Sequence, residues 1–298
     1  MKRGLKHWIR LLSVGLIGGI VFACILIELS YISGITQPAP SVVGDASHGN
    51  DDIEYLPVTL HNEKDDIRLS GWYVPSKNRA AVILLHGFDG NRLGIKPQAD
   101  VLARHGYGVL LYDLRGHGES GGEVRAFGWE DVEDVNAALE FLSAREEVDA
   151  DRIGIVGFSI GGQIAIRATA GNERLRAIIA DDPGFVTVDD APGPANGTER
   201  IMYLVSWIDG RGVSLWTGIP IPPGVTEVVG EISPRPIMFI DTGGTGSQAL
   251  IRHFYELAGE PKELWEIPEA YHGGQFEARP LEYEEKMINF FDEALLKE

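Results

Sequence analysis

The 298 residues are enough for one large domain or two small ones, and a hydrophobic share of 44% excludes global disorder. The chain holds 26 Lys and Arg against 44 Asp and Glu, so its formal net charge is −18. The first 30 residues carry four of the cations and one anion, which leaves −21 on the remainder. So acidic a body repels phosphate backbones and anionic lipid headgroups, and no nucleic-acid partner is expected. The single cysteine, Cys24, excludes an intramolecular disulfide, a cysteine-based metal site and a thiol-dependent mechanism.

The N-terminal 30 residues have the pattern of a membrane segment. A basic flank, MKRGLKHWIR, precedes a run without charge from Leu11 to Ile27, and the first anion is Glu28. About 20 apolar residues cross a bilayer as a helix, and a basic flank stays on the cytoplasmic side. We therefore expect residues 1–30 to form a cytoplasmic flank and one transmembrane helix, a single-pass anchor in the cell membrane that leaves the rest extracytoplasmic.

Two other interpretations of this segment stay open. A cleaved signal peptide would yield a secreted protein, although no clean small-x-small site follows the apolar run. A lipoprotein signal at VFAC fits less well, because Phe22 is bulky and apolar residues continue beyond Cys24. Residues 31–53, which are rich in Pro, Gly, Asn and Asp, predict a flexible stalk ahead of a domain over 54–298.

From residue 54 onward, short apolar runs alternate with amphipathic stretches. PVTLHN and IRLSGWYVP, joined by EKDD, predict a β-hairpin. Further strands are expected at AAVILLHG, YGVLLYDL, RIGIVGF, LRAIIADD, RPIMFID and KELWEIP, and helices at about 96–105, 130–144, 160–170, 247–258 and 280–296. Repeated strand–helix alternation with short links requires right-handed crossovers, so the predicted fold class is α/β, with a doubly wound, mostly parallel sheet.

Residues 184–232 interrupt this alternation. They are rich in Pro and Gly and carry large apolar side chains, among them Phe185, Trp207 and Trp216. A segment of this length between two core strands is usually a lid or a binding insertion, so we expect a lid-like insertion here. The plainer alternative is a solvent-facing excursion with a few helical turns.

A G-x-S-x-G motif, formed by Gly157, Ser159 and Gly161, follows the predicted strand RIGIVGF and precedes a predicted helix. Alone the motif is weak, but this strand–turn–helix setting is the one it requires in a nucleophile elbow. The sharp turn needs flanking glycines and places the serine hydroxyl at a helix N-terminus, where developing negative charge is stabilised. Ser159 is therefore the candidate nucleophile.

Serine needs a base to take its proton, and His272 is the best of the eight histidines. It lies in PEAYHGG after the last predicted strand, and loops after the carboxyl ends of parallel strands gather at one edge of the sheet. His86 opens HGF after the strand AAVILL, where we expect it to shape the turn. That turn would aim the amide of Phe88 into the site, and with the amide of Ile160 it would form a two-donor oxyanion hole.

Five segments in order, LLHGF, YDLRGHGES, VDADRIGIVGFSIGG, ISPRP and AGEPKELWEIPEAYHGG, resemble the bacterial α/β-hydrolase superfamily, on its serine esterase and dienelactone-hydrolase-like side. The resemblance covers about residues 55–297. It implies the α/β-hydrolase fold, Ser159 as nucleophile, His272 as base, and Phe88 and Ile160 as oxyanion donors. In DLRGHGES it implies loop-bracing roles for Asp113, Arg115 and His117.

The third member of the triad departs from this pattern. The family usually carries an acid a few residues past the strand RPIMFID, but no acid occurs from Thr242 to Arg252. Asp241, which ends that strand, is the first substitute. Asp181 or Asp182, after the preceding strand, is the alternative position that some α/β-hydrolases use.

Together these features predict a membrane-anchored serine hydrolase, carboxylesterase-like, that cleaves a small-molecule carboxylic ester or related acyl compound through an acyl-serine intermediate. No cofactor and no metal are implied, and the sequence does not define the oligomeric state. Two other functions stay open: a catalytically impaired hydrolase-fold protein that binds ligands, suggested by the vacant acid position, and a peptidase or thioesterase that uses the same triad.

Overall fold

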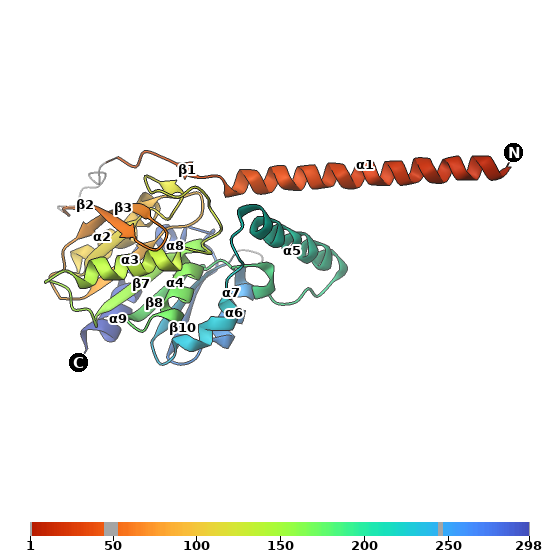
Figure 1. Ribbon diagram of the computed structural model, residues 1–298. Helices are drawn as coiled ribbons and strands as arrows, with labels where there is room; N and C mark the ends of the chain where they lie inside the picture. Colours follow the sequence, from red (N-terminus) through yellow and green to blue (C-terminus); the bar gives the residue numbers. More distant parts are fainter. Residues whose placement is uncertain (1, 45–52, 244–246, 298) are drawn as a thin grey trace.

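The computed structural model describes residues 2–44, 53–243 and 247–297, and it consists of a central sheet with helices on both faces and one long projecting helix (Figure 1). The sheet has the strand order β10-β9-β8-β7-β4-β5-β3-β2. β2 pairs antiparallel with β3 and β3 antiparallel with β5, while the other neighbours are parallel. The strands are β2 (Leu56–Asn62), β3 (Ile67–Val74), β4 (Ala81–Leu85), β5 (Gly108–Tyr112), β7 (Ile153–Phe158), β8 (Leu175–Asp181), β9 (Ile237–Thr242) and β10 (Lys262–Ile267).

Two apolar cores, one on each face of the sheet, hold this architecture together. In β4 the side chains alternate: Ile83 and Leu85 join one core, and Val82 and Leu84 join the other. The first core takes in α3 (Val132–Ser143), α4 (Ile160–Gly171) and α7 (Ser247–Leu257). The second takes in α2 (Lys96–Arg104) and α9 (Pro280–Phe291). The doubly wound, mostly parallel α/β sheet is therefore confirmed.

The remaining elements are short. They are β1 (Ala39–Pro40), η1 (Arg92–Ile95), β6 (His117–Gly118), η2 (Val188–Asp190), α6 (Val225–Val228), η3 (Val229–Ile232), α8 (Gln275–Ala278) and η4 (Asp292–Leu296). β1 pairs with β6 in a separate two-stranded sheet.

The residues predicted as a stalk differ from the expectation. Helix α1 (Lys2–Thr36) runs six residues past position 30, and Ile32 is buried against the body. Beyond it, the amide of Ala39 donates to Gly116 O at 2.8 Å, and Val43 is buried. Residues 31–44 are thus ordered on the body through contacts distant in sequence, while 45–52 lie outside the described residues.

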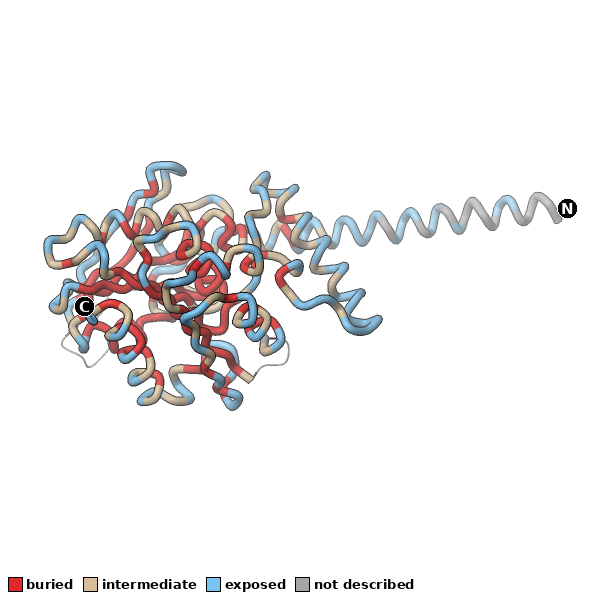
Figure 2. Tube along the Cα trace, turned by 90° about the horizontal axis from the view of Figure 1, so that it is seen from below, coloured by how far each residue is buried: buried red, intermediate tan, exposed pale blue. Residues whose placement is uncertain are grey.

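The predicted insertion at 184–232 contains one long helix, α5 (Gly197–Thr217), together with η2, α6 and η3. Asn196 caps α5 by accepting from the amide of Glu199 at 3.0 Å, and Gly218, at φ +75°, ends it in the left-handed conformation. Helix α5 packs beside the C-terminal part of α1, and both project from the same end of the body (Figures 1 and 2).

Candidate active site

Ser159 occupies a strained turn between β7 and α4. Its φ of +54° and ψ of −116° lie outside the regions that L-residues favour. A Cβ at Gly157 would clash with the carbonyl oxygen of Gly161, and one at Gly161 would clash with that of Leu85. The two glycines of the motif are therefore required by close backbone approach, and the turn leaves the hydroxyl partly exposed at the carboxyl edge of the sheet.

The imidazole of His272 lies between this hydroxyl and a carboxylate. Nε2 is 3.0 Å from Ser159 Oγ, and Nδ1 is 2.6 Å from Asp182 Oδ2. His272 comes from the loop after β10 and Asp182 directly follows β8, so three loops at one sheet edge supply the three groups. The ring packs on Phe158, with centroids 4.8 Å apart, which limits its orientation.

Asp182 is held from a second side as well. It is 2% exposed, its φ is +45°, and its amide donates to Ile240 O at 2.8 Å. Thr242 Oγ1 donates to the same Oδ2 that faces the ring, at 2.6 Å. Thr242 was not singled out from the sequence, and no local signal marks it, because its role depends on β8 and β9 pairing side by side.

The other two acids considered from the sequence point elsewhere. Asp241 is buried and, among the described residues, neither of its carboxylate oxygens has a hydrogen-bond partner; burial, with the nearby charge of Asp182, raises its pKa to about 6. Asp181 accepts from Tyr283 OH at 2.8 Å, and burial raises its pKa to about 7. The structure thus brings Asp182, and not the first-choice Asp241, against the imidazole.

The carboxylate sets the proton affinity of the ring. The hydrogen bond to Asp182 raises the pKa of His272 above its ordinary value of 6.5, although partial burial opposes this. A proton on Nδ1 leaves Nε2 free to accept from Ser159. The arrangement can therefore remove the hydroxyl proton at neutral or mildly alkaline pH.

The two amides expected to donate to an oxyanion belong to segments next to Ser159. Ile160 is the first residue of α4, and Phe88 lies in the loop after β4. A Cβ at Gly87 would lie 3.4 Å from that of Ser159, so the loop carrying Phe88 adjoins the hydroxyl. In the described part of the chain no acceptor takes a hydrogen bond from the amide of Phe88 or Ile160. Neither amide is therefore paired within the described residues, as the predicted oxyanion hole requires.

His86 fixes this loop. Leu114 N donates to His86 Nε2 at 2.9 Å, so Nδ1 carries the proton and donates to Gly87 O at 2.7 Å. Burial lowers the pKa of His86 to about 3, so the ring is neutral. His117 packs edge-on against the rings of His86 and Phe88. These contacts fit a bracing role.

The charged residues of DLRGHGES are also bound into the structure. Asp113 is fully buried and accepts from the amides of Arg92 and Glu119 at 2.7 and 2.8 Å. Arg115 donates to both oxygens of Asp134. Neither side chain contacts Ser159 or His272.

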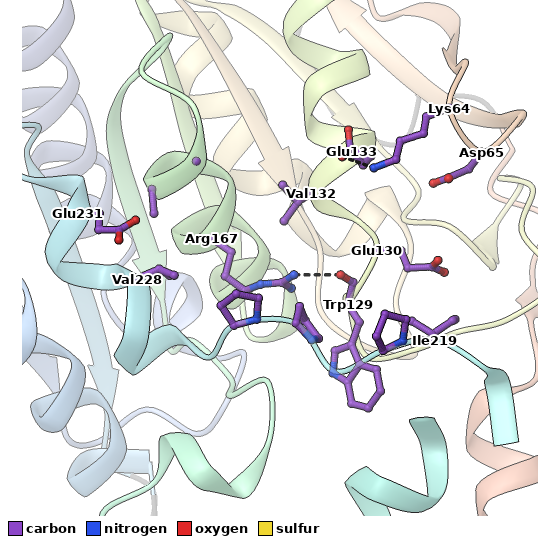
Figure 3. Close-up of a pocket in the computed structure, with 15 residues that line it drawn as sticks. Lys64, Asp65, Trp129, Glu130, Val132, Glu133, Arg167, Ile219, Val228 and Glu231 are labelled. Carbon is purple, nitrogen blue, oxygen red and sulfur yellow. Dashed lines mark hydrogen bonds and ion pairs between the residues drawn. The ribbon is translucent and has the colours of Figure 1, made fainter. Parts of the chain in front are cut away.

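Two of the cavities that the insertion helps to line flank the loops near the site. The first, of about 450 Å³, opens between the β2–β3 turn, α3, α4 and the proline-rich segment after α5 (Figure 3). Arg167 and Trp129 line it, but Ser159 and His272 do not. The second, of about 210 Å³, is lined by α1, α5 and the loops carrying Phe127 and Phe185. Phe127 stacks on Phe88, with centroids 5.0 Å apart, so this cavity adjoins the loop that carries Phe88.

No cluster of three His, Cys, Asp or Glu side chains suited to a metal ion occurs within residues 2–44, 53–243 and 247–297. The site is built from serine, imidazole, carboxylate and backbone amides.

Comparisons with known proteins agree with the fold. Residues 80–210 match the family model of the alpha/beta hydrolase fold. The chain is similar to the uncharacterized protein YfhR of Escherichia coli O157:H7, 27% identical over 290 residues that cover 93% of this chain and 92% of YfhR. It is also similar to the thiohydrolase aneE of Aspergillus aculeatus, 33% identical over 136 residues, or 44% of this chain and 41% of aneE. Among solved structures it resembles the esterase Pf2001 of Pyrococcus furiosus, with a TM-score of 0.71 and 26% identity over 87% of this chain and 98% of the esterase.

Proposed function

We propose that this chain, which has the α/β hydrolase fold, is a serine hydrolase that cleaves carboxylic esters through an acyl-serine intermediate. The observation that carries the proposal is the continuous hydrogen-bonded series from Ser159 through His272 to Asp182, at 3.0 and 2.6 Å. The similarity to an esterase of the same fold supports it.

In the first half of the reaction, Ser159 Oγ attacks the ester carbonyl carbon while His272 Nε2 takes the hydroxyl proton. The amides of Phe88 and Ile160 hold the oxyanion, and each such donor contributes about 3 kcal/mol to the transition state. The tetrahedral intermediate then releases the alcohol, which receives the proton from His272. Asp182 stabilises the imidazolium and keeps Nε2 aimed at the serine.

In the second half, water attacks the acyl-serine as His272 takes one of its protons. Collapse of the second tetrahedral intermediate releases the carboxylic acid and returns the proton to Ser159 Oγ. No cofactor enters these steps, and all the groups involved come from the loops after β4, β7, β8 and β10.

A fluorophosphonate probe tests this proposal, because it phosphonylates only an activated serine. We expect stoichiometric labelling of the full-length protein, loss of labelling in Ser159→Ala, and parallel loss of 4-nitrophenyl butyrate hydrolysis. An unlabelled, inactive wild-type protein of native fold would overturn the proposal and favour the ligand-binding alternative. The position of Asp182 weakens that alternative, since it depended on a vacant acid position.

Thioester cleavage is the second candidate, favoured by the similarity to a thiohydrolase over 136 residues. The same nucleophile, base and oxyanion donors serve both reactions. Comparing kcat/KM for an oxygen ester and a thioester of the same acyl group decides between the two.

We further propose that α1 anchors the protein in a membrane. Gly18–Thr36 is long and apolar enough to span a bilayer, although a signal sequence has the same properties. Helix α1 is 35 residues long, or about 52 Å, whereas the hydrocarbon layer is about 30 Å. The helix is therefore long enough for the uncharged run of residues 11–27 to lie in the bilayer while the last turns, which include the buried Ile32 and Thr36, pack on the hydrolase body.

A further inference from the structure

Helix α5 exposes an apolar surface, whereas the exposed face of a helix in water is normally polar. In its outer half, the charged first turn with Glu199 and Arg200 is followed by Ile201–Ile208, which reads IMYLVSWI and contains no charge. Six of these eight side chains are large, hydrophobic and at least 40% exposed: Ile201, Met202, Leu204, Val205, Trp207 and Ile208. Contiguous exposed apolar surface of this kind marks a site of contact with a protein or a membrane.

The neighbour of this surface indicates what covers it. Helix α5 runs in the same direction as α1: Glu28 and Asp209 line the same groove, and a Cβ at Gly212 would clash with the side chain of Ile32. Val205 and Ile208 line a groove together with Cys24, so this part of α5 lies beside the apolar part of α1 that precedes Glu28. Both helices project from the same end of the body, and the outermost turns of α5 slope away from α1 (Figures 1 and 2). An apolar groove of about 530 Å³ runs between them, with Cys24, Leu29, Val205 and Leu215 among its lining residues.

The opposite side of the α1–α5 contact leads toward the catalytic groups. The cavity of about 210 Å³ is lined there by Tyr31 and Ile35 of α1 and by Val213 of α5. Its floor includes Phe127 and Phe185. Phe127 stacks on Phe88, and Phe185 follows Gly184, whose amide donates to Ser159 O at 2.9 Å. The two helices thus form a wall between the exposed apolar surface and the cavity beside Phe127 and Phe185, whose loops adjoin those of Phe88 and Ser159.

We infer that the outer half of α5 lies in the leaflet from which α1 emerges, and that the substrate is a long-chain acyl ester that passes its acyl chain from the bilayer between α1 and α5 to Ser159. This inference rests on the proposed serine hydrolase function and names its substrate class. A neutral ester fits best, because residues 31–298 carry a net charge of −21. Hydrolysis breaks the acyl C–O bond; water supplies the hydroxyl of the fatty acid and the proton of the alcohol.

A second copy of the chain is the other possible occupant of the α5 surface. The bilayer is favoured because α1 and α5 lie side by side. A membrane crossed by the apolar part of α1 surrounds the outer half of α5 as well, without any further partner.

The test compares two esters with the full-length protein in phosphatidylcholine vesicles. One is 4-methylumbelliferyl oleate dissolved in the bilayer, and the other is water-soluble 4-nitrophenyl acetate. The variant Ile201→Glu/Leu204→Glu places two charges on the α5 surface, outside both cavities. The matched control, Leu281→Glu, changes an apolar residue that is 81% exposed on α9, away from α1 and α5.

We expect the double variant to hydrolyse the oleate ester at least tenfold more slowly, with 4-nitrophenyl acetate hydrolysis within twofold of wild type. Leu281→Glu should leave both rates within twofold. Equal oleate hydrolysis by wild type and double variant would overturn the inference and leave the hydrolase proposal standing. Absence of Ser159-dependent hydrolysis of either ester would instead remove the proposed function, and the inference with it.

A second measurement does not depend on activity. A nitroxide on Met202→Cys, in a Cys24→Ser background, should be relaxed by oxygen and shielded from a water-soluble nickel complex when the protein is in vesicles. Strong relaxation by the nickel complex would place the surface in water. Shielding from both reagents, with a dimeric mass in detergent, would show that a second copy covers it. Either result contradicts membrane insertion of α5.

Discussion

At the scale of single residues, the site depends on how one carboxylate is held. Asp182 sits in a left-handed backbone conformation at the end of β8, with Thr242 on one side of its oxygen and His272 on the other. Asp241, one strand away, is buried without a hydrogen-bond partner among the described residues. We therefore expect substitutions of Asp182 and of Asp241 to have different effects on catalysis.

Replacing Asp182 with Asn should lower kcat for 4-nitrophenyl butyrate by about 10³- to 10⁴-fold, because an amide opposite Nδ1 favours the wrong tautomer. Asp241→Asn, an equally isosteric change, should alter kcat less than threefold. Steady-state kinetics on both variants, with circular dichroism to verify folding, measure this. A larger loss in Asp241→Asn than in Asp182→Asn would reverse the assignment.

The pH dependence follows from the direction of the His272 shift. Because Asp182 raises the pKa of this imidazole above 6.5, the neutral ring that accepts the Ser159 proton is lost as pH falls through that higher value. The profile of kcat/KM should therefore have an acid limb with an apparent pKa above 6.5 and a plateau on the alkaline side. An acid limb centred below 6 would contradict the His272–Asp182 ion pair.

The sequence predicted some of these residues and not others, for physical reasons. Ser159 is marked by the glycines that its turn requires, and His272 by its place after the last strand. The acid was ambiguous because Asp181, Asp182 and Asp241 all lie at or next to the carboxyl ends of the neighbouring strands β8 and β9, and which one faces the ring depends on strand register and loop conformation. Thr242 carries no signal of its own, since its hydroxyl becomes relevant only once β9 lies beside β8.

At the scale of elements, the turn between β7 and α4 is the tightest part of the site. Gly157→Ala should destabilise the protein by more than about 3 kcal/mol, because the new methyl group would clash with the carbonyl oxygen of Gly161. Gly171→Ala, at the last residue of α4 and with nothing within 4 Å of its Cβ, should change stability by less than about 1 kcal/mol. Urea unfolding followed by fluorescence compares them. Equal stability of the two variants would show that the backbone at Gly157 does not lie as close to the carbonyl group of Gly161 as the structure indicates.

The strands of the sheet and the helices that cover it were predictable because the local hydrophobic pattern of each segment agrees with its place in the tertiary structure. The central strands β4, β5 and β7 are continuous apolar runs, and the side chains of β4 divide alternately between the two cores. Residues 31–44 were not predictable in the same way. Their Pro and Gly content suggests a stalk, yet the partner of Ala39 is Gly116 and that of Gln37 is Arg125, contacts that no local pattern reveals.

At the scale of the whole molecule, positive charge is concentrated at the N-terminus and negative charge on the body. Residues 2–10 carry four cations, while residues 31–298 carry −21. The full-length protein should stay in the membrane pellet after alkaline carbonate extraction. Protease added to right-side-out vesicles should digest the hydrolase body, whereas inverted vesicles should protect it. Release by carbonate, or protection in right-side-out vesicles, would contradict the proposed anchor or its orientation.

The most direct measurement of the central claim is capture of the acyl-enzyme. Full-length protein turning over 4-nitrophenyl butyrate is quenched with acid within milliseconds, digested and analysed by peptide mass spectrometry. The proposed mechanism predicts a butyryl group on Ser159, accumulating in a burst equal to the released nitrophenol and absent from Ser159→Ala. Turnover with no acylated peptide, or with the butyryl group on another residue, would contradict it.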